Sequence, residues 1–372
     1  MAGKPHIFGG GKRGFLQLMS HLDKNLFQIY SCCALNEDQE SALKSMDVNI
    51  VNIDIQQGTI LPAIHKMVKF LRSEKIDIIH SQGARADVYC RVVSQLAKFN
   101  IKSVNTVQML VEGYDVHLLK KKFYCCLDRI TEKCVDKFIV VSEMLKDRLI
   151  NGHKISEKKV EKIYNGIELN QYNKNVGRDL SDKLKSDFGL KPTDYIIGAI
   201  GRMVWQKGFK YLIHAIPKIA LSMPQVKILF VGDGPLLGSL EALGRNLGVD
   251  DNLIFTGFRE DIKALLSIID LLAIPSLLEG FPMITLEAMA MAKPIIGTSI
   301  DGISEQIENE DNGLLVPPKN SDALSEGIIR IFNDREFAEK ISASGRKRVE
   351  KAYSIENTVR QIQNVYNLLI YG

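Results

Sequence analysis

The chain has 372 residues, of which 45% are hydrophobic and 25% are charged, as in an ordinary globular protein. This length exceeds what a single core usually supports, so it predicts two domains. No apolar run approaches the roughly 18 residues of a membrane span, and the start of the chain has no apolar segment followed by a cleavage site. We therefore expect a cytoplasmic protein that has neither a membrane-spanning helix nor a secretory signal.

The net charge of +4 is unevenly distributed along the chain. Residues 1–172 hold 25 Lys and Arg against 19 Asp and Glu, whereas the remainder holds 23 against 25. The first part is basic and the second slightly acidic. This asymmetry predicts that the first part meets an anionic partner.

The cysteines and histidines do not indicate a metal site. No C-x-x-C pair occurs, and no metal-ligand spacing is present. We interpret the cysteines as reduced core residues, the usual role of buried thiols in a cytoplasmic protein. The six cysteines are Cys32, Cys33, Cys90, Cys125, Cys126 and Cys134.

The first half alternates strand-like and helix-like segments. After the glycines at 9–14, apolar residues repeat at helical spacing through Phe15, Leu18, Met19 and Leu22. This βαβ rhythm predicts a parallel sheet covered by helices on both faces. We expect strands at 27–35, 48–55, 76–81, 102–107 and 137–142, and helices at 62–74, 85–98 and 117–135.

The rhythm breaks over residues 165–195, near the turn signal Asn165-Gly166, and then restarts. Two doubly wound α/β domains in tandem would form a cleft lined by loops from the carboxyl ends of their strands. In the second half we expect strands at 195–203, 226–235, 252–258, 271–276 and 293–298, and helices at 321–333, 335–351 and 354–369.

The segment GGGKRGF, residues 9–15, matches the dinucleotide pattern G-x-G-x-x-G through Gly9, Gly11 and Gly14. Glu37 and Asp38 follow at about the distance of a ribose-binding acid, but the strand before the glycines is short. A tight structural turn, a nicotinamide site and a cradle for another phosphate all remain open at this point.

Two segments of the second half carry more information. GRMVWQKGF, residues 201–209, follows a buried strand and carries Arg202 and Lys207, a pair of cations that suits a pyrophosphate. In residues 277–298, Glu279 and Glu287 bracket seven residues, and Pro282 suits a first helical turn. The backbone amides at the start of that helix can face ligand oxygens. Each of the charged side chains also has an ordinary structural explanation, as a surface charge or as a carboxylate near a helix start.

Together these segments resemble the retaining glycosyltransferases of family four, which include bacterial polysaccharide and lipopolysaccharide enzymes. The resemblance covers about residues 195–372 and, less tightly, residues 100–172. Its markers are GRMVWQKGF, the FTGF strand end, EGFPMITLEAMAMAKPII and DGISEQIENEDNGLLVPP. It implies GT-B architecture, an α/β fold of two Rossmann-like doubly wound domains that face each other across a cleft.

The resemblance implies three parts of the chain. Residues 1–172 would form an N-terminal acceptor domain, and residues 173–352 a C-terminal domain for the nucleotide-sugar donor. Residues 353–372 would form a helix that returns to the N-terminal domain. The enzyme would need no cofactor and no metal, and no D-x-D motif is present to suggest one.

The resemblance also implies roles for particular residues. Arg202 and Lys207 would grip the donor diphosphate, Glu279 would meet hydroxyls of the transferred sugar, and Glu287 would hold the ribose. The pocket for the sugar and phosphates would be formed by Gly280, Phe281, Pro282, Met283 and Ile284. The base would pack against Gly257, Phe258 and Arg259. The glycines that approach the diphosphate would be Gly10 and Gly11.

The chemistry implied is cleavage of the anomeric C–O bond, with the two cations stabilising the departing diphosphate. Retention fits a front-face path in which the leaving phosphate takes the acceptor's proton. Double displacement through a carboxylate is the alternative. The donor is expected to be a UDP-sugar, and the acceptor a glycan or a lipid-linked sugar; no nucleic acid is expected.

Gln108 departs from the family pattern, because many members have a histidine there. Gln82 likewise replaces a second histidine, and we interpret His80 as structural. Altered donor contacts or a catalytically inactive sugar-nucleotide-binding subunit would both explain the change. An NAD-dependent oxidoreductase is a weaker alternative that leaves the two glutamates unexplained.

Residues 117–129 place Lys120, Lys121 and Lys122 beside Leu118, Leu119 and Phe123. A basic amphipathic helix can lie on an anionic membrane surface, although an ordinary solvated helix face is the alternative. With the basic balance of the first half, the helix predicts peripheral contact with the inner face of the membrane.

Overall fold

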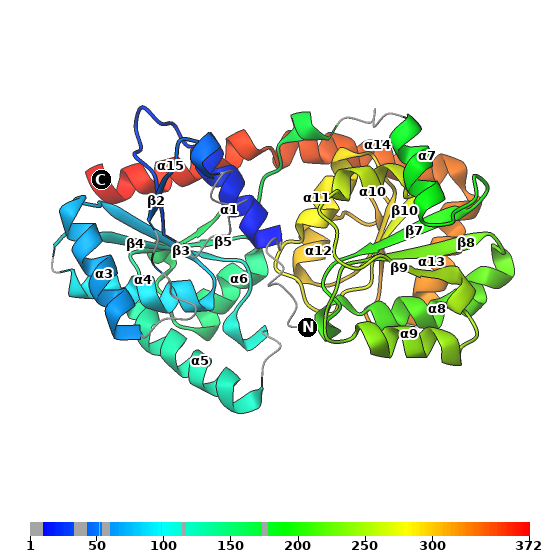
Figure 1. The fold of residues 1–372 in the computed structure, drawn as a ribbon, viewed down its shortest axis with the longest axis horizontal. Coiled ribbons are helices and arrows are strands. Elements are labelled where there is room, and N and C mark those ends of the chain that lie inside the picture. The colour runs from blue at the N-terminus through cyan, green and yellow to red at the C-terminus, as the bar shows by residue number, and fades with distance from the viewer. Residues whose placement is uncertain are drawn as a thin grey trace. The chain divides into compact units, whose positions relative to one another are not determined.

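The computed structural model describes residues 10–32, 43–51, 53, 60–97, 99–113, 117–172 and 178–372. The chain forms two compact units (Figure 1). The N-terminal unit comprises Gly11–Gly166 with Ile355–Gly372, and the C-terminal unit comprises Ile167–Ser354. Each unit contains a parallel sheet, as the alternating pattern predicts. The domain limits at 172 and 352, and the roles assigned to the domains, stay predictions.

The N-terminal unit contains a four-stranded parallel sheet in the order β3-β4-β5-β6. A separate parallel pair consists of β1 (Tyr30–Cys32) and β2 (Asn49–Val51). These two strands are shorter than expected, and residues 33–35, 52 and 54–55 of the expected strands lie outside the described residues. The four strands of the larger sheet are β3 (Ile78–Gln82), β4 (Lys102–Val107), β5 (Lys137–Val140) and β6 (Val160–Lys162).

Among the described residues of the N-terminal unit, two of the apolar clusters join its larger sheet to helices. One joins the sheet to α1 (Gly10–His21) and α15 (Ile355–Tyr371), and the other joins it to α3 (Ile60–Ser73) and α4 (Ala84–Leu96). Helix α5 (Leu118–Thr131) packs against α4. The shorter helices are η1 (Val111–Gly113), η2 (Glu132–Cys134), α6 (Glu143–Asp147), the π-helix η3 (Arg148–Gly152) and η4 (Glu157–Lys159).

The sheet of the C-terminal unit has six parallel strands in the order β12-β11-β10-β7-β8-β9. The chain runs from β7 outward to β9 and then returns to β10 on the other side of β7. The strand order therefore reverses between β7 and β10, where doubly wound sheets bind ligands. The strands are β7 (Tyr195–Ile200), β8 (Val226–Val231), β9 (Leu253–Phe255), β10 (Leu271–Ile274), β11 (Ile295–Thr298) and β12 (Leu314–Val316).

Helices cover both faces of this sheet (Figure 1). The main core lies between the strands and α8 (Phe209–Ser222), α9 (Leu237–Asn246) and α13 (Ser321–Asn333). Among the described residues, no helix is long and apolar enough to span a bilayer. The other helices are η5 (Leu169–Gln171), α7 (Arg178–Asp187), η6 (Trp205–Lys207), η7 (Asp250–Asn252), α10 (Ile262–Ile268), α11 (Met283–Ala290), α12 (Asp301–Gln306) and α14 (Arg335–Ala352).

Candidate active site

Most of the predicted site residues belong to loops that follow β7, β9 and β10 in the C-terminal unit. The carboxyl ends of parallel strands lie at one edge of a sheet, so these loops gather there. Backbone hydrogen bonds join them to the loop after β8: the Met203 amide donates to the Asp233 carbonyl, and the Gly232 amide donates to the Gly257 carbonyl. The site is therefore built on connected loops.

An ion pair between Lys207 and Glu279 crosses the point where the strand order reverses. Lys207 ends η6 after β7, and its Nζ lies 2.6 Å from Oε1 of Glu279 in the loop after β10. Ser276 Oγ donates to the same oxygen at 2.8 Å. The Glu279 side chain is 7% exposed, which fits a carboxylate held by a cation and a hydroxyl. Two of the three predicted catalytic side chains therefore touch.

Close backbone contacts hold the two loops together. Gly208 has a φ of +61°, and a Cβ there would lie 2.0 Å from the Pro275 carbonyl oxygen, so this position requires glycine. The Gln206 carbonyl accepts the amide of Leu277 at 2.6 Å. These contacts hold the Lys207 loop against the Glu279 loop.

Arg202 lies at the start of the same loop and is exposed. Within the described part of the chain, its guanidinium has no ion pair or hydrogen bond. An unpaired arginine beside a strand end is available to an anionic ligand. Its chemistry therefore differs from that of Lys207, whose charge already meets a carboxylate.

Helix α11 begins one residue later than Pro282. Pro282 is the N-cap, with φ −67° and ψ 126°, and Met283 is the first helical residue. The prediction of Pro282 inside the first turn is wrong by one position, because its extended ψ leads into the helix. Gly280, Phe281 and Met283 are buried, whereas Ile284 is half-buried. Phe281 packs edge-on against Tyr353 at 5.4 Å, so part of the predicted pocket wall serves the core.

The loop before α11 is fixed from the other side by α12. A Cβ on Gly302 would lie 1.9 Å from the Gly280 carbonyl oxygen, and Gln306 Nε2 donates to the Pro282 carbonyl at 3.0 Å. Glu287 lies on α11 and is 3% exposed. The Tyr172 hydroxyl donates to its Oε1 at 3.1 Å.

The segment predicted to face the base follows β9. Gly257 has a φ of +69°. Arg259 makes two hydrogen bonds to Asp261, at 2.8 and 2.6 Å, and stacks on the Phe188 ring at 5.6 Å. Arg259 is thus tied to its neighbours, whereas the Gly257 carbonyl accepts the Gly232 amide and so joins this segment to the connected loops.

The opening glycines are helical where they are described. Gly10, Gly11 and Gly14 lie in α1, which corrects the expectation of a turn at these positions, and Gly9 lies outside the described residues. The first backbone amides of a helix have no acceptor within the helix, and glycine has no side chain to shield them, so the start of α1 could face an anion. The role of Gly10 and Gly11 stays a prediction.

Gln108 is anchored at the end of β4 in the N-terminal unit. Its Nε2 donates to Asn165 Oδ1 at 2.9 Å, and Asn165 Nδ2 donates to Gln108 Oε1 at 2.8 Å. The half-buried His80 ring lies between the Tyr366 hydroxyl and Thr106 Oγ1, with a hydrogen bond to each. Burial lowers the pKa of His80 to about 3, so its ring stays neutral, in agreement with a structural role.

Sequence reasoning did not single out Ser276 or Tyr172. Ser276 stands three positions before Glu279, and small hydroxyl residues are common in loops. Tyr172 is 115 positions from Glu287, and only the fold brings them together. The described residues contain no group of His, Cys, Asp and Glu that could hold a metal ion.

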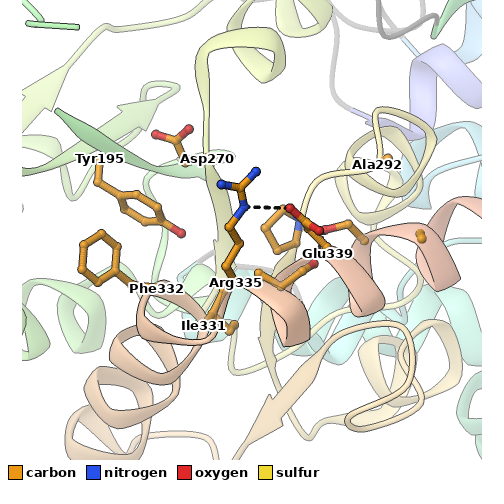
Figure 2. A pocket seen from close by; sticks show the side chains of 11 residues that line it. Tyr195, Asp270, Ala292, Ile331, Phe332, Arg335 and Glu339 are labelled. Carbon is orange, nitrogen blue, oxygen red and sulfur yellow. Dashed lines mark hydrogen bonds and ion pairs between the residues drawn. The ribbon is translucent and has the colours of Figure 1, made fainter. Parts of the chain in front are cut away.

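A cavity of about 580 Å³ lies at the opposite, amino-terminal edge of the same sheet (Figure 2). Tyr195 and Asp270 stand at strand starts, Phe332 on α13, and Arg335 and Glu339 on α14. Arg335 pairs with Glu339 at 2.8 Å, and Asp270 accepts the Ile196 amide at 2.8 Å. These polar groups of the cavity are thus engaged in contacts within the protein, and no sequence motif points to the cavity.

The chain is similar to known glycosyltransferases. Residues 8–171 match Glycosyltransferase Family 4, and residues 181–348 match Glycosyl transferases group 1. Two uncharacterized glycosyltransferases of Methanocaldococcus jannaschii are 35% identical over 239 residues (64% of this chain, 60% of the relative) and 30% identical over 304 residues (80% and 77%).

An Escherichia coli enzyme, UDP-Gal:α-D-GlcNAc-diphosphoundecaprenol α-1,3-galactosyltransferase, is 25% identical over 372 residues, which span 97% of this chain and 94% of the enzyme. The crystal structure of Anabaena Alr3699/HepE in complex with UDP-glucose superposes with a TM-score of 0.84 at 22% identity, covering 99% of this chain and 98% of that one. The fold is therefore GT-B.

Proposed function

The chain belongs to glycosyltransferase family 4, a family of retaining enzymes, and from this premise we propose that it transfers a sugar from a UDP-sugar to a lipid-linked or other glycan acceptor. The UDP donor is supported by the fold's likeness to a protein crystallised with UDP-glucose. The acceptor class is supported by the E. coli relative, whose name gives a diphosphoundecaprenol-linked sugar as substrate.

The Lys207–Glu279 ion pair at the reversal of strand order is the observation that supports this function most directly. Oε1 of Glu279 is already held by Lys207 and Ser276, and within the described residues Oε2 has no protein partner. Oε2 is then able to accept a hydrogen bond from a hydroxyl of the transferred sugar. We assign Glu279 to substrate positioning.

In the proposed reaction, the bond between the anomeric carbon and the diphosphate oxygen breaks, and the oxygen leaves with the electron pair. Arg202 and Lys207 stabilise the negative charge that develops. The departing phosphate accepts the proton of the acceptor hydroxyl, whose oxygen bonds to the anomeric carbon on the same face. The sugar configuration is retained without a protein nucleophile.

Family membership leaves the oxidoreductase interpretation without support, whereas the inactive-subunit alternative needs an assay. Lys207→Ala removes a preorganised cation from the transition state, so we expect kcat to fall by about a hundredfold or more. Glu279→Gln keeps the shape of the side chain but removes its negative charge, so it tests whether the carboxylate is required. The measurement is release of UDP from UDP-sugars with a diphosphoundecaprenol-linked acceptor.

Lys210→Ala is the matched control, because Lys210 is exposed on the neighbouring helix α8 and its Nζ lies 5.0 Å from the Tyr211 ring. We expect wild-type rates for it. Rates near wild type in both Lys207→Ala and Glu279→Gln would refute the site. A folded wild-type protein that binds UDP-sugars but transfers nothing, with any acceptor, would favour the inactive subunit.

The proposed acceptor places the enzyme at a membrane surface, and α5 offers a face for it. Leu119, Phe123 and Ile130 are 72%, 61% and 64% exposed, and Lys122 on the helix and Lys133 in η2 directly after it are also exposed. The side chains of Leu118 and Lys120 lie outside the described ones. Apolar residues interleaved with lysines fit the boundary of an anionic bilayer, so we propose peripheral binding through α5.

A further inference from the structure

The buried carboxylate of Glu287 has a phenol as a partner. Glu287 is 3% exposed and Tyr172 is 9% exposed, and their Oε1 and hydroxyl oxygen lie 3.1 Å apart. A buried carboxylate needs hydrogen-bond donors, and a phenol can donate one hydrogen bond to it. The contact therefore helps to fix the orientation of the Glu287 carboxylate.

Tyr172 is itself held in place by α14. Arg346 Nη1 donates to the Tyr172 carbonyl at 3.0 Å and also to the Ala290 carbonyl at the last turn of α11. Arg346 Nε pairs with Glu350 on its own helix. One guanidinium thus ties the backbone of Tyr172 to the helix that carries Glu287. Arg346 therefore helps to position both the phenol of Tyr172 and the carboxylate of Glu287.

Glu287 lies about one helical turn, roughly 6 Å, beyond the amino end of α11. A diphosphate near the free amides of Met283 and Ile284 would place the attached ribose within reach of that carboxylate. The vicinal 2′ and 3′ hydroxyls of a ribose are paired donors, and they match the two oxygens of a carboxylate.

We propose that Tyr172 is a positioning residue for the donor's ribose: its hydroxyl holds Oε1 of Glu287 so that the carboxylate accepts both ribose hydroxyls. This inference rests on the proposed function, since it takes the bound ligand to be a nucleoside diphosphate. It predicts that Tyr172 affects recognition of the 2′ hydroxyl and leaves the diphosphate contacts and the chemical step unchanged.

The test compares binding of UDP and 2′-deoxy-UDP by calorimetry. We expect the wild type to prefer UDP by about tenfold, the size of one hydrogen bond to a charged group. In Tyr172→Phe the preference should fall to about two- to threefold, with affinity for 2′-deoxy-UDP almost unchanged. The donor KM should rise while kcat at saturating donor stays constant.

Two further variants separate positioning from general damage. In Glu287→Gln the preference should also fall, and adding Tyr172→Phe should then change it little further, because both residues act on one contact. Tyr195→Phe is the control: this phenol lies in the same unit at the opposite edge of the sheet, and its removal should leave the preference intact.

The outcomes distinguish the two proposals. A wild type that prefers UDP, with the full preference kept in Tyr172→Phe, overturns the role of Tyr172 and leaves the proposed function standing. An equal loss of affinity for both nucleotides in Tyr172→Phe also overturns it. If UDP does not bind, the proposed donor is wrong, and the same comparison with GDP and 2′-deoxy-GDP tests Tyr172.

Discussion

His153 lies between two carboxylates of the N-terminal unit. Its Nδ1 is 2.5 Å from Glu132, its Nε2 is 3.4 Å from Glu112, and its side chain is 3% exposed. Burial by itself would lower the pKa of His153, but the hydrogen bonds to Glu112 and Glu132 outweigh it and raise the pKa to about 9. The hydrogen bond with His153 in turn lowers the pKa of Glu112 to about 2.

These shifts predict a pH window for stability. The contribution of His153 is complete below its unfolded pKa of about 6.5 and is lost as pH rises through about 9. The contribution of Glu112 is complete above about 4.5 and is lost as pH falls through about 2. Both are therefore fully present only between about pH 4.5 and 6.5.

The measurement is the free energy of unfolding of the wild type and of His153→Gln across this range. Near pH 6 we expect the wild type to be more stable by on the order of 1–3 kcal/mol, and the difference should shrink as pH approaches 10. NMR titration of the imidazole checks the pKa directly. A difference that stays constant from about pH 6 to 10 would contradict the charged clamp.

The sequence alone could indicate residues whose role follows from local spacing. Glu279 and Glu287 are close in sequence, one in a loop and the other on the helix that follows it, and Lys207 lies shortly after a buried strand, so local spacing indicates all three. The partners of His153 are 21 and 41 positions away, and those of Glu287 are farther still, so one-dimensional spacing could not reveal them. Long-range side-chain pairs are the part of the site that needs the fold.

Among the helices, α5 combines a packed side with an unusual outer side. The helix lies against α4 and carries Asp128 inward to Arg91, which is 2% exposed and pairs with it at 2.6 Å. Outward it carries Leu119, Phe123 and Ile130. A solvated helix face normally presents few large apolar groups together, so the outer side favours a partner surface.

Lys122→Glu with Lys133→Glu should weaken binding to vesicles that contain phosphatidylglycerol by about tenfold or more, because each lysine near an anionic surface contributes about 1 kcal/mol. Co-sedimentation measures it. Lys347→Glu with Lys351→Glu on α14 makes the same change in net charge at exposed sites and should have little effect. Equal recovery of the wild type with purely zwitterionic vesicles would exclude the anionic-surface proposal.

At the level of elements, periodicity predicted long, regular segments best. The expected strand at 102–107 is β4 (Lys102–Val107), and the expected helix at 321–333 is α13 (Ser321–Asn333). The strands β6 and β12 were not expected, because three residues are too few to reveal an alternating pattern. Helix α7 lies in the polar stretch interpreted as a break, where exposed charges hide its apolar side.

For the molecule as a whole, the final helix belongs to the core of the N-terminal unit. Helix α15 contributes Ile355, Val359, Ile362, Val365 and Tyr366 to the cluster that contains Leu18, Val104 and Ile139. The chain therefore completes its first unit only after the second unit has been made. Removal of these five side chains would take away about 8–15 kcal/mol of apolar burial, which is as much as a typical domain's whole stability.

A matched pair of substitutions on α15 tests this dependence without truncation. Ile362 is 5% exposed in the cluster, whereas Leu368, later on the same helix, is 68% exposed. Ile362→Ala should destabilise the N-terminal unit by about 2–5 kcal/mol, because it leaves a cavity, and Leu368→Ala should change stability by no more than about 0.5 kcal/mol.

Hydrogen exchange of the amides in β4 and β5 reports the loss locally. Amides of β7 and β8 should keep their protection in Ile362→Ala, since their core is formed by α8, α9 and α13. If β4 and β5 remained as protected as in the wild type, α15 would be an appendage and not part of that core.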